Sequence, residues 1–339
     1  MNATTNRAQK LLSMTLAFGL MLAAAAFGSA EAATLEKVKL AQFGQAKFLL
    51  YLPLYVAQEE GFFAQQGLDV DVRFAGNDDQ IFAAVMSGSV DYGMGDPVFT
   101  AIAAERGAAA KTVALLITQL ALAGYTNNPD VPLITKPEQL AGLRVGSFPA
   151  PSTTYTVLDG LKRQYPALAK TQIVPGGMGT QLALLEAGKT DIAVDLEPSV
   201  AQAVTRGYRI VLNLNDFVPP QAITGLMTRQ DTVAQHPDQV QRMVNAMQQA
   251  MTAIYADPAV AHRTARKLFP DLGEAVIQSA VDHMRRDAMY PTSVVVPDEY
   301  WQRTLQTRLD SGDLKRPQAT DVAVDNRFAV AAAAHYGKK

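Results

Sequence analysis

The pattern of apolar and polar positions predicts alternating strands and helices along most of the chain. Period-two alternation is typical of strands, and apolar positions three or four residues apart are typical of helices. We predict strands over residues 37–43, 68–74 and 90–94, and helices over residues 52–65 and 79–87. Strands that are separated by helices pair in parallel, because a parallel connection needs a crossover. The pattern therefore predicts an α/β fold with mostly parallel sheets flanked by helices.

A Gly-x-x-Asp turn occurs twice at corresponding places. Residues 88–91 and 188–191 each follow a predicted helix and precede a predicted strand. Glycine suits the left-handed end of a helix, and aspartate bonds nearby backbone groups. Upstream, residues 143–146 correspond to the strand at residues 38–40. The turn is common on its own, but its recurrence within two βαβ units favours two similar lobes.

The second lobe is predicted to be an insertion into the first. Two further strands, over residues 120–126 and 223–228, lie beside turn-rich segments and would form the hinge between the lobes. We predict a first lobe over residues 33–126 and 223–339 and a second lobe over residues 127–222. A helix over residues 239–255 has an apolar, methionine-rich stripe, which indicates core packing rather than a cofactor site.

Composition supports a globular protein and excludes several functions. The 339 residues are 48% apolar, with 30 basic and 32 acidic side chains and a net charge of −2. This length is enough for about two domains, and the charge balance disfavours nucleic acid as a partner. The absence of cysteine excludes disulfides and thiolate chemistry. The four histidines lack metal-ligand spacing, and no nucleophile elbow or phosphate loop is present, so we expect no cofactor.

The N-terminal segment has the features of an export signal. Arg7 and Lys10 precede an uncharged apolar run over residues 11–27, and Ala30-Glu31-Ala32 supplies a small-x-small cleavage pattern. We predict a cleavable signal peptide over residues 1–32 and a periplasmic product. The alternative, an uncleaved anchor, would need an apolar run of about 20 residues.

Several segments resemble one known family. Residues 52–70, LPLYVAQEEGFFAQQGLDV, resemble the opening of the substrate-binding proteins that serve nitrate, sulfonate, taurine and thiamine-pyrimidine ABC importers. The resemblance continues at residues 87–93, 140–146, 187–192, 197–198 and 298–302. It implies a two-lobed periplasmic binding protein fold of type II. It also implies a small-molecule ligand held between the lobes and delivery to an inner-membrane ABC permease with its ATPase. We expect a monomer.

The candidate ligand-binding residues lie where parallel strands end and helices begin, since ligands of open α/β sheets bind there. In the first lobe they are Gln42, Phe43, Tyr55, Asn77, Asp78 and Asp96; in the second they are Ser147, Ser152, Thr153, Thr154, Tyr155, Asp195 and Glu197. The helix start near Ser152 offers free N–H groups and hydroxyls to an anionic oxygen. For Asn77, Asp78, Asp96 and Ser152, helix capping is the alternative role. Leu196 stands where the family often has an aromatic residue.

The four acids of this set bear on the kind of ligand. They would repel a bare anion and favour N–H donors, so a pyrimidine precursor or a zwitterion such as taurine fits better than nitrate. Two alternatives remain open. One is an enzyme similar to the pyrimidine synthase of thiamine biosynthesis, although that enzyme depends on a cysteine-rich segment. The other is a periplasmic sensor subunit that docks on a signalling receptor.

Overall fold

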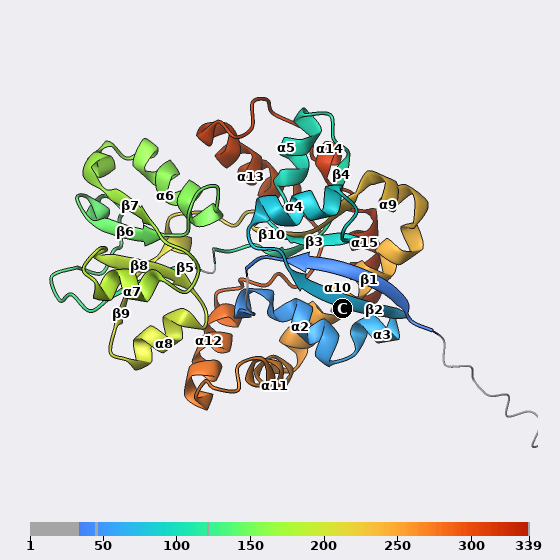
Figure 1. The fold of residues 1–339 in the computed structure, drawn as a ribbon, viewed down its shortest axis with the longest axis horizontal. Helices are drawn as coiled ribbons and strands as arrows, with labels where there is room; N and C mark the ends of the chain where they lie inside the picture. Colours follow the sequence, from blue (N-terminus) through green and yellow to red (C-terminus); the bar gives the residue numbers. More distant parts are fainter. Residues whose placement is uncertain (1–33, 45–46, 121, 338–339) are drawn as a thin grey trace, which may run out of the picture. The chain divides into compact units, whose positions relative to one another are not determined.

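The protein is described here from a computed structural model that covers residues 34–44, 47–120 and 122–337. The predicted signal peptide over residues 1–32 lies outside these described residues. The strands form two five-stranded sheets (Figure 1), in the orders β2-β1-β3-β10-β4 and β7-β6-β8-β5-β9. The first sheet consists of β1 (Glu36–Gln42), β2 (Leu68–Phe74), β3 (Tyr92–Gly95), β4 (Ala110–Ile117) and β10 (Thr224–Arg229). The second consists of β5 (Leu122–Thr126), β6 (Arg144–Ser147), β7 (Gln172–Pro175), β8 (Ile192–Leu196) and β9 (Arg209–Asn213).

Both sheets are mixed, and the antiparallel pairs come from one strand in each. In the first sheet β1 runs parallel to β2 and β3, whereas β10 is antiparallel to β3 and β4. In the second sheet β6 runs parallel to β7 and β8, whereas β5 is antiparallel to β8 and β9. The strands β5 and β10 are those predicted to form the hinge. Each is fully paired within one sheet, and β5 pairs in the second sheet although residues 120–126 were assigned to the first lobe.

The sequence repeat corresponds to equivalent places in the two sheets. The turn at Gly88 leads into β3 and the turn at Gly188 leads into β8, which are the central strands of their sheets. Both glycines have positive φ, 75° and 64°. A carboxyl oxygen of Asp91 accepts the Lys39 N–H at 2.8 Å, and that of Asp191 accepts the Arg144 N–H at 2.8 Å. The repeated aspartate therefore fastens each turn to the neighbouring parallel strand.

Helices flank both sheets (Figure 1). With the first sheet lie α2 (Leu52–Glu59), α3 (Phe62–Gln65), α4 (Asp78–Met86), α5 (Phe99–Glu105), α9 (Gln230–Gln235), α10 (Pro237–Ala256), α11 (Pro258–Leu268), α13 (Asp298–Ser311), α14 (Thr320–Ala323) and α15 (Arg327–Tyr336). With the second lie α6 (Thr153–Gln164), α7 (Gln181–Glu186) and α8 (Ser199–Thr205). Short 3-10 turns are η1 (Leu49–Tyr51), η2 (Pro137–Leu140), η3 (Pro166–Lys170) and η4 (Leu214–Asp216). Among the described residues, no helix combines the length and the apolarity that a membrane crossing requires.

Two predicted helices show how local sequence sets the boundaries. The helix predicted over residues 52–65 is divided into α2 and α3 at Gly61, whose φ of 72° is left-handed and cannot continue a right-handed helix. The helix predicted over residues 239–255 is α10, and the apolar stripe is fully buried, including Met243, Met247 and Met251. The methionine stripe is therefore core, as predicted.

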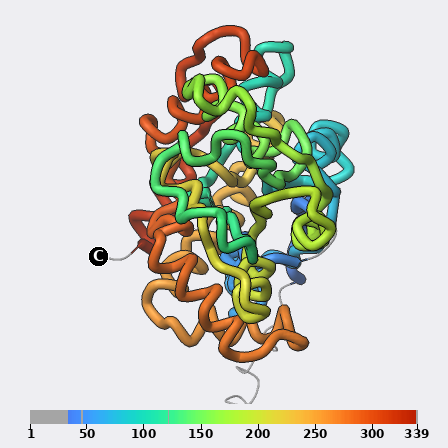
Figure 2. Tube along the Cα trace, turned by 90° about the vertical axis from the view of Figure 1, so that its left-hand side faces the viewer, coloured from blue at the N-terminus to red at the C-terminus, as the bar shows by residue number. Residues whose placement is uncertain are grey.

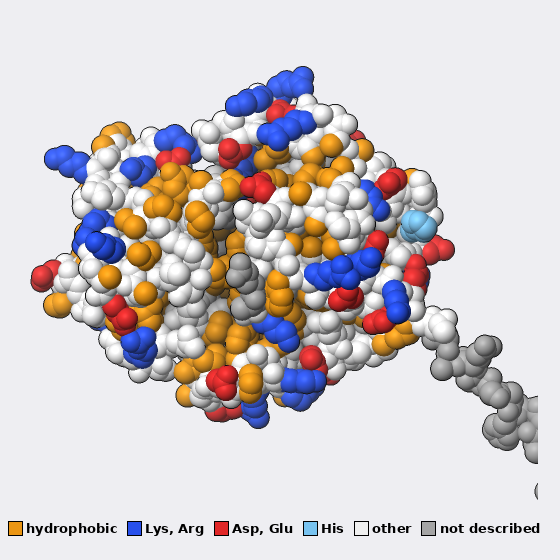
Figure 3. Space-filling model, viewed as in Figure 1, with side chains coloured by type: hydrophobic (Ala, Val, Ile, Leu, Met, Phe, Trp, Pro, Cys, Tyr) orange, Lys and Arg blue, Asp and Glu red, His pale blue; other side chains and the backbone are white. Residues whose placement is uncertain are grey.

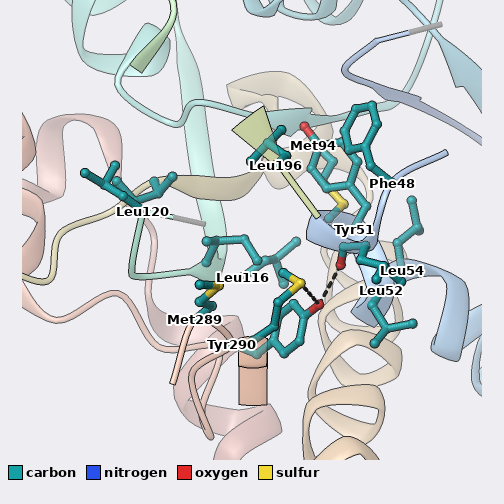
Figure 4. Packing of buried hydrophobic residues seen from close by; sticks show 14 of the residues in the cluster. Phe48, Tyr51, Leu52, Leu54, Met94, Leu116, Leu120, Leu196, Met289 and Tyr290 are labelled. Carbon is teal, nitrogen blue, oxygen red and sulfur yellow. Dashed lines mark hydrogen bonds between the residues drawn. The ribbon is translucent and has the colours of Figure 1, made fainter. Parts of the chain in front are cut away.

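One apolar core connects the two sheets. Phe48, Tyr51 and Leu52 pack in the same buried cluster as Leu116 of β4 and Leu196 of β8 (Figure 4). The hydroxyl of Tyr290 donates to the Leu49 carbonyl oxygen at 2.5 Å. The helix α12 (Glu274–Arg286) packs against α8, and Figure 2 shows these orange and yellow-green segments side by side. Segments distant in sequence thus hold the two sheets against one another.

Candidate functional site

A cleft of about 530 Å³, counted with the space open at its mouth, lies between residues of the two sheets. It is lined by Phe43, Leu50, Tyr51, Asp78, Asp96, Leu120, Leu122, Phe148, Ser152, Thr153, Thr154, Leu196, Ile223 and Thr224. Six of the predicted site residues therefore meet here, namely Phe43, Asp78, Asp96, Ser152, Thr153 and Thr154. Hydrophobic side chains gather along the hollow on this face of the molecule (Figure 3).

Two carboxylates from the first sheet meet at one end of the cleft. Asp78 begins α4, and its Oδ1 accepts the backbone N–H of Asp96 at 2.8 Å. Gly95 makes this approach possible, because a Cβ there would lie 2.5 Å from Asp78 Oδ1. Burial, and then the negative charge of Asp96, raise the pKa of Asp78 to about 7. Asp78 can therefore change its charge near neutral pH.

The second carboxylate is already paired. Asp96 is 5% exposed, and its Oδ2 accepts hydrogen bonds from Arg308 Nη2 and from the Thr153 hydroxyl, the latter at 3.2 Å. Its Oδ1 accepts the Val98 N–H at 3.0 Å. Since every oxygen of Asp96 has a partner, Asp78 is the acid better placed to accept a bond from a ligand.

The opposite side of the cleft is the first turn of α6. Ser152 is the N-cap of this helix, and its Oγ accepts the Tyr155 N–H at 3.3 Å. Capping is thus one function of Ser152, while Thr153 and Thr154 line the cleft beside it. Two hydroxyls and the start of a twelve-residue helix face the carboxylates from the second sheet.

The rest of the lining is apolar. Phe43 and Tyr51 come from the first-sheet side and Phe148 from the second, with leucine and isoleucine side chains between them. The described residues that line the cleft include no lysine, arginine or histidine. The Arg308 guanidinium behind Asp96 is itself paired with Asp96 and Asp313. The cleft therefore combines aromatic walls with acceptor groups and hydroxyls.

Five predicted residues lie near the cleft without lining it. Gln42 is fully buried, and its Oε1 accepts the Tyr55 hydroxyl at 2.8 Å inside the core. Asn77 caps α4 through a reciprocal pair of hydrogen bonds with Gln80. Helix capping, which was the alternative to ligand binding, is therefore the role that is observed. The remaining two are Ser147, whose hydroxyl donates to the Phe148 carbonyl oxygen, and Tyr155, which is partly exposed on α6. For all five, ligand contact stays a prediction.

Asp195 and Glu197 flank the lining residue Leu196 and are themselves buried. Burial, and to a smaller extent the charge of Glu197, raise the pKa of Asp195 to about 7, although its Oδ1 accepts the Leu196 N–H. Glu197 Oε1 lies 3.1 Å from Nδ1 of His283 on α12, whose Nε2 lies 3.2 Å from Asp287. Glu197, followed by Asp287, raises the pKa of His283. Contact of either acid with a ligand stays a prediction.

Sequence reasoning missed the apolar lining and Arg308. The unpredicted lining residues are Leu50, Tyr51, Leu120, Leu122, Phe148, Leu196, Ile223 and Thr224. Leu120, Leu122, Ile223 and Thr224 belong to the two segments that were predicted as hinge strands. Their position between the lobes could have identified them as lining residues. Arg308 had no such signal, because it lies 212 residues from Asp96 in the sequence. The described residues contain no cluster of three or more side chains arranged to hold a metal ion.

A sequence model of the family described as NMT1/THI5 like matches residues 50–261. The chain belongs to the NMT1/THI5-like family. It is 26% identical over 306 residues to YtlA of Bacillus subtilis (strain 168), covering 88% of this chain and 89% of YtlA. It is 22% identical over 316 residues to the riboflavin-binding protein RibY of Chloroflexus aurantiacus, covering 87% and 86% of the two chains.

Solved structures confirm the fold. The alkanesulfonate-binding protein SsuA of Xanthomonas axonopodis pv. citri, bound to MOPS, matches with a TM-score of 0.67 at 17% identity, covering 86% of this chain and 98% of SsuA. The periplasmic nitrate-binding protein NrtA of Synechocystis PCC 6803 matches with a TM-score of 0.71 at 14% identity, covering 89% of each chain. The family resemblance and the two-lobed periplasmic binding protein fold predicted from it are therefore confirmed.

The same fold also occurs in an enzyme. The desulfurization enzyme DSZB matches with a TM-score of 0.59 at 15% identity, covering 89% of this chain and 99% of DSZB. The fold by itself thus leaves both binding and catalysis open, and the choice between them depends on the residues of the cleft.

Proposed function

We propose that this protein is a periplasmic solute receptor whose cleft captures a small, largely apolar solute with N–H donors, such as a pyrimidine precursor or a related nitrogen heterocycle. It then hands the solute to an ABC permease. The observation that carries the proposal is the lining of the cleft. Aromatic side chains face a carboxylate at Asp78, and no cationic side chain is among the described lining residues.

The chemistry of the cleft favours a heterocycle over a simple anion. Phe43, Tyr51 and Phe148 offer flat apolar surface to a ring, which aromatic side chains bind well. The Asp78 carboxyl accepts N–H groups, and the hydroxyls of Thr153 and Thr154 can satisfy further polar atoms. An anion would meet the Asp78 charge with only the start of α6 to offset it. The riboflavin-binding relative is consistent with a heterocyclic ligand.

Binding without catalysis is the simpler use of these residues. Glu197 and His283 are paired with each other and lie outside the cleft lining, and Asp96 is neutralised by Arg308. The cleft is thus left with one carboxyl that no cation neutralises and with several hydroxyls. The Thr153 hydroxyl donates to Asp96, but Arg308 already pairs with that carboxylate, so this contact does not provide a free base. This arrangement supports capture of a solute unchanged.

Calorimetric titration with a defined panel tests the ligand class. We expect 4-amino-5-hydroxymethyl-2-methylpyrimidine or riboflavin to bind, and taurine, MOPS and nitrate to bind much more weakly or not at all. Mass spectrometry of solute retained through native purification gives an independent identification. Binding of MOPS or nitrate alone would reject the heterocycle, and turnover of any bound compound would reject the receptor.

Delivery is tested separately with the whole transporter. Proteoliposomes that contain a candidate ABC permease with its ATPase should accumulate the bound solute only when the receptor is added. A receptor that binds the solute but does not support accumulation, and instead alters the output of a signalling receptor, would favour the sensor alternative.

A further inference from the structure

The guanidinium of Arg308 lies buried where α13 meets the first turn of α6. Its side chain is 4% exposed. The helix α13 belongs with the first sheet, because Trp301 and Leu305 pack in one cluster with Val98 and Leu115. The helix α6 packs on β7 of the second sheet, and it also contacts α13. Arg308 therefore reaches from the body of one sheet to the body of the other.

The hydrogen bonds of Arg308 divide between the two bodies. On the first-sheet side, Nη2 donates to Asp96 and Nη1 donates to Asp313 at 3.2 Å. On the second-sheet side, Nη1 donates to the Thr156 hydroxyl at 2.9 Å and to the Pro151 carbonyl oxygen at 3.4 Å. All these bonds join protein atoms, so their formation does not depend on a solute.

The same network includes the cleft. The Asp96 oxygen that accepts Arg308 also accepts the Thr153 hydroxyl, and Thr153 lines the cleft. Arginine is suited to this position, since its planar group has five donors and stays charged when buried. Moving α6 away would break the bonds from Arg308 to Thr156 and from Thr153 to Asp96. Because this site is buried, leaving these polar groups without partners would cost free energy.

We propose that Arg308 is a positioning residue that fixes the first turn of α6 against Asp96, and so sets the fraction of molecules in which the cleft is closed. Its effect on solute affinity rests on the proposed function. A receptor that is closed in only part of the population has an apparent affinity reduced by that fraction. The effect of Arg308 on the spacing of the two sheets is independent of any solute.

Distance measurement between two spin labels tests the proposal without adding a solute. The chain has no cysteine, so A64C in α3 and K189C beside β8, both at exposed positions, would carry the only labels. In this background T156V removes one acceptor of Arg308 without leaving the guanidinium unpaired, and R308Q removes its charge. The control is T232V, since Thr232 is as buried as Thr156, at 5% exposure, but lies in α9.

We expect T156V to lower the ratio of short to long label distances about five- to tenfold, which corresponds to one lost hydrogen bond. R308Q should lower this ratio further, and T232V should leave it unchanged. Circular dichroism and thermal melting would show that each variant is folded; if R308Q does not fold, the double variant T153V/T156V replaces it. Distance distributions identical to the parent in both T156V and the second variant would overturn the proposal. Because no solute is present, failure of the proposed ligand class cannot produce that result.

Discussion

At the scale of single residues, Asp78 is the cleft side chain that gains or loses its charge near neutral pH. Its Oδ1 is held by the Asp96 N–H, and its pKa of about 7 places both protonation states near neutral pH. Asp96, in contrast, is held by Arg308 and Thr153. The two neighbouring carboxylates therefore differ: Asp96 is tied into the structure, and Asp78 is the one that we propose recognises the solute.

Replacing Asp78 with asparagine tests this role. D78N should weaken binding of the heterocycle about tenfold or more, since it removes a hydrogen bond to a charged acceptor. For a solute that does not itself titrate between pH 6 and 8.5, affinity for the parent protein should rise as the pH increases through about 7 and Asp78 ionises. In D78N the affinity should be independent of pH.

Calorimetric titration at several pH values measures both effects. The matched control is D79N, which alters the neighbouring exposed acid on the same turn of α4. Equal affinity of D78N and the parent protein across this pH range would exclude Asp78 from recognition.

The raised pKa of Asp195 affects the stability of the protein. Its pKa is raised from 3.8 to about 7, so the folded protein binds a proton more tightly than the unfolded chain does. Stability should therefore fall as the pH rises from about 4 to 7.

D195N retains an acceptor for the Leu196 N–H but removes the charge. Between pH 5 and pH 8 its free energy of unfolding, relative to the parent, should increase by about 2 to 3 kcal/mol, at about 1.4 kcal/mol per pKa unit. Urea unfolding at the two pH values measures this, and a constant difference would contradict it.

At the scale of elements, the start of α6 has a structural role, and we propose that it also contacts the solute. Ser152 caps the helix and also lines the cleft. S152A should destabilise the protein by about 1 kcal/mol, or a few °C in Tm, because it removes the cap. S152N can still cap, so its Tm should stay close to that of the parent while solute affinity falls. Thermal melting together with calorimetry separates the two roles; unchanged affinity in S152N would leave Ser152 with capping alone.

The repeated strand and helix units were predictable because their signals are local. β2 coincides with the predicted strand over residues 68–74, and the paired turns at Gly88 and Gly188 occupy equivalent places. The sequence did not predict that β5 and β10 pair antiparallel with their neighbours. Strand pairing depends on partners about 70 to 130 residues away in the sequence, such as Tyr125 with Ala193 and Leu226 with Met94. Alternation within one strand carries no information about that choice.

The candidate site was predictable to a similar extent. The rule that ligands bind at strand ends found Phe43, Asp78 and the start of α6, since these positions follow from the order of local elements. The rule could not separate Asp78, which lines the cleft, from Asn77, which caps a helix. It also could not find Arg308, whose role follows from the packing of a late helix against α6.

At the scale of the whole molecule, the polar contacts that join the sheets include those of Arg308 and those of His283, and these two sets differ in their response to pH. Arg308 keeps its charge at all accessible pH values, and its pKa is raised further despite the opposing effect of burial. His283 lies between Glu197 and Asp287, so both ring nitrogens face carboxylates and the protonated ring is favoured. The contact between α12 and the second sheet should therefore weaken in base, whereas the contact through Arg308 should not.

Replacing His283 with glutamine tests this difference. Because the pKa of His283 is raised above 6.5 in the folded protein, its stabilising effect is complete below about pH 6.5 and is lost as the pH rises through the raised value. The parent protein should melt higher than H283Q at pH 6, and the gap should narrow towards pH 9. Small-angle scattering should show a larger radius of gyration for H283Q than for the parent at pH 6 and similar radii at pH 9.

H262Q is the matched control, since His262 pairs with Asp282 between α11 and α12 and does not span the sheets. A gap between the parent and H283Q that does not change with pH, or an equal expansion in H262Q, would show that His283 does not link the sheets through its charge.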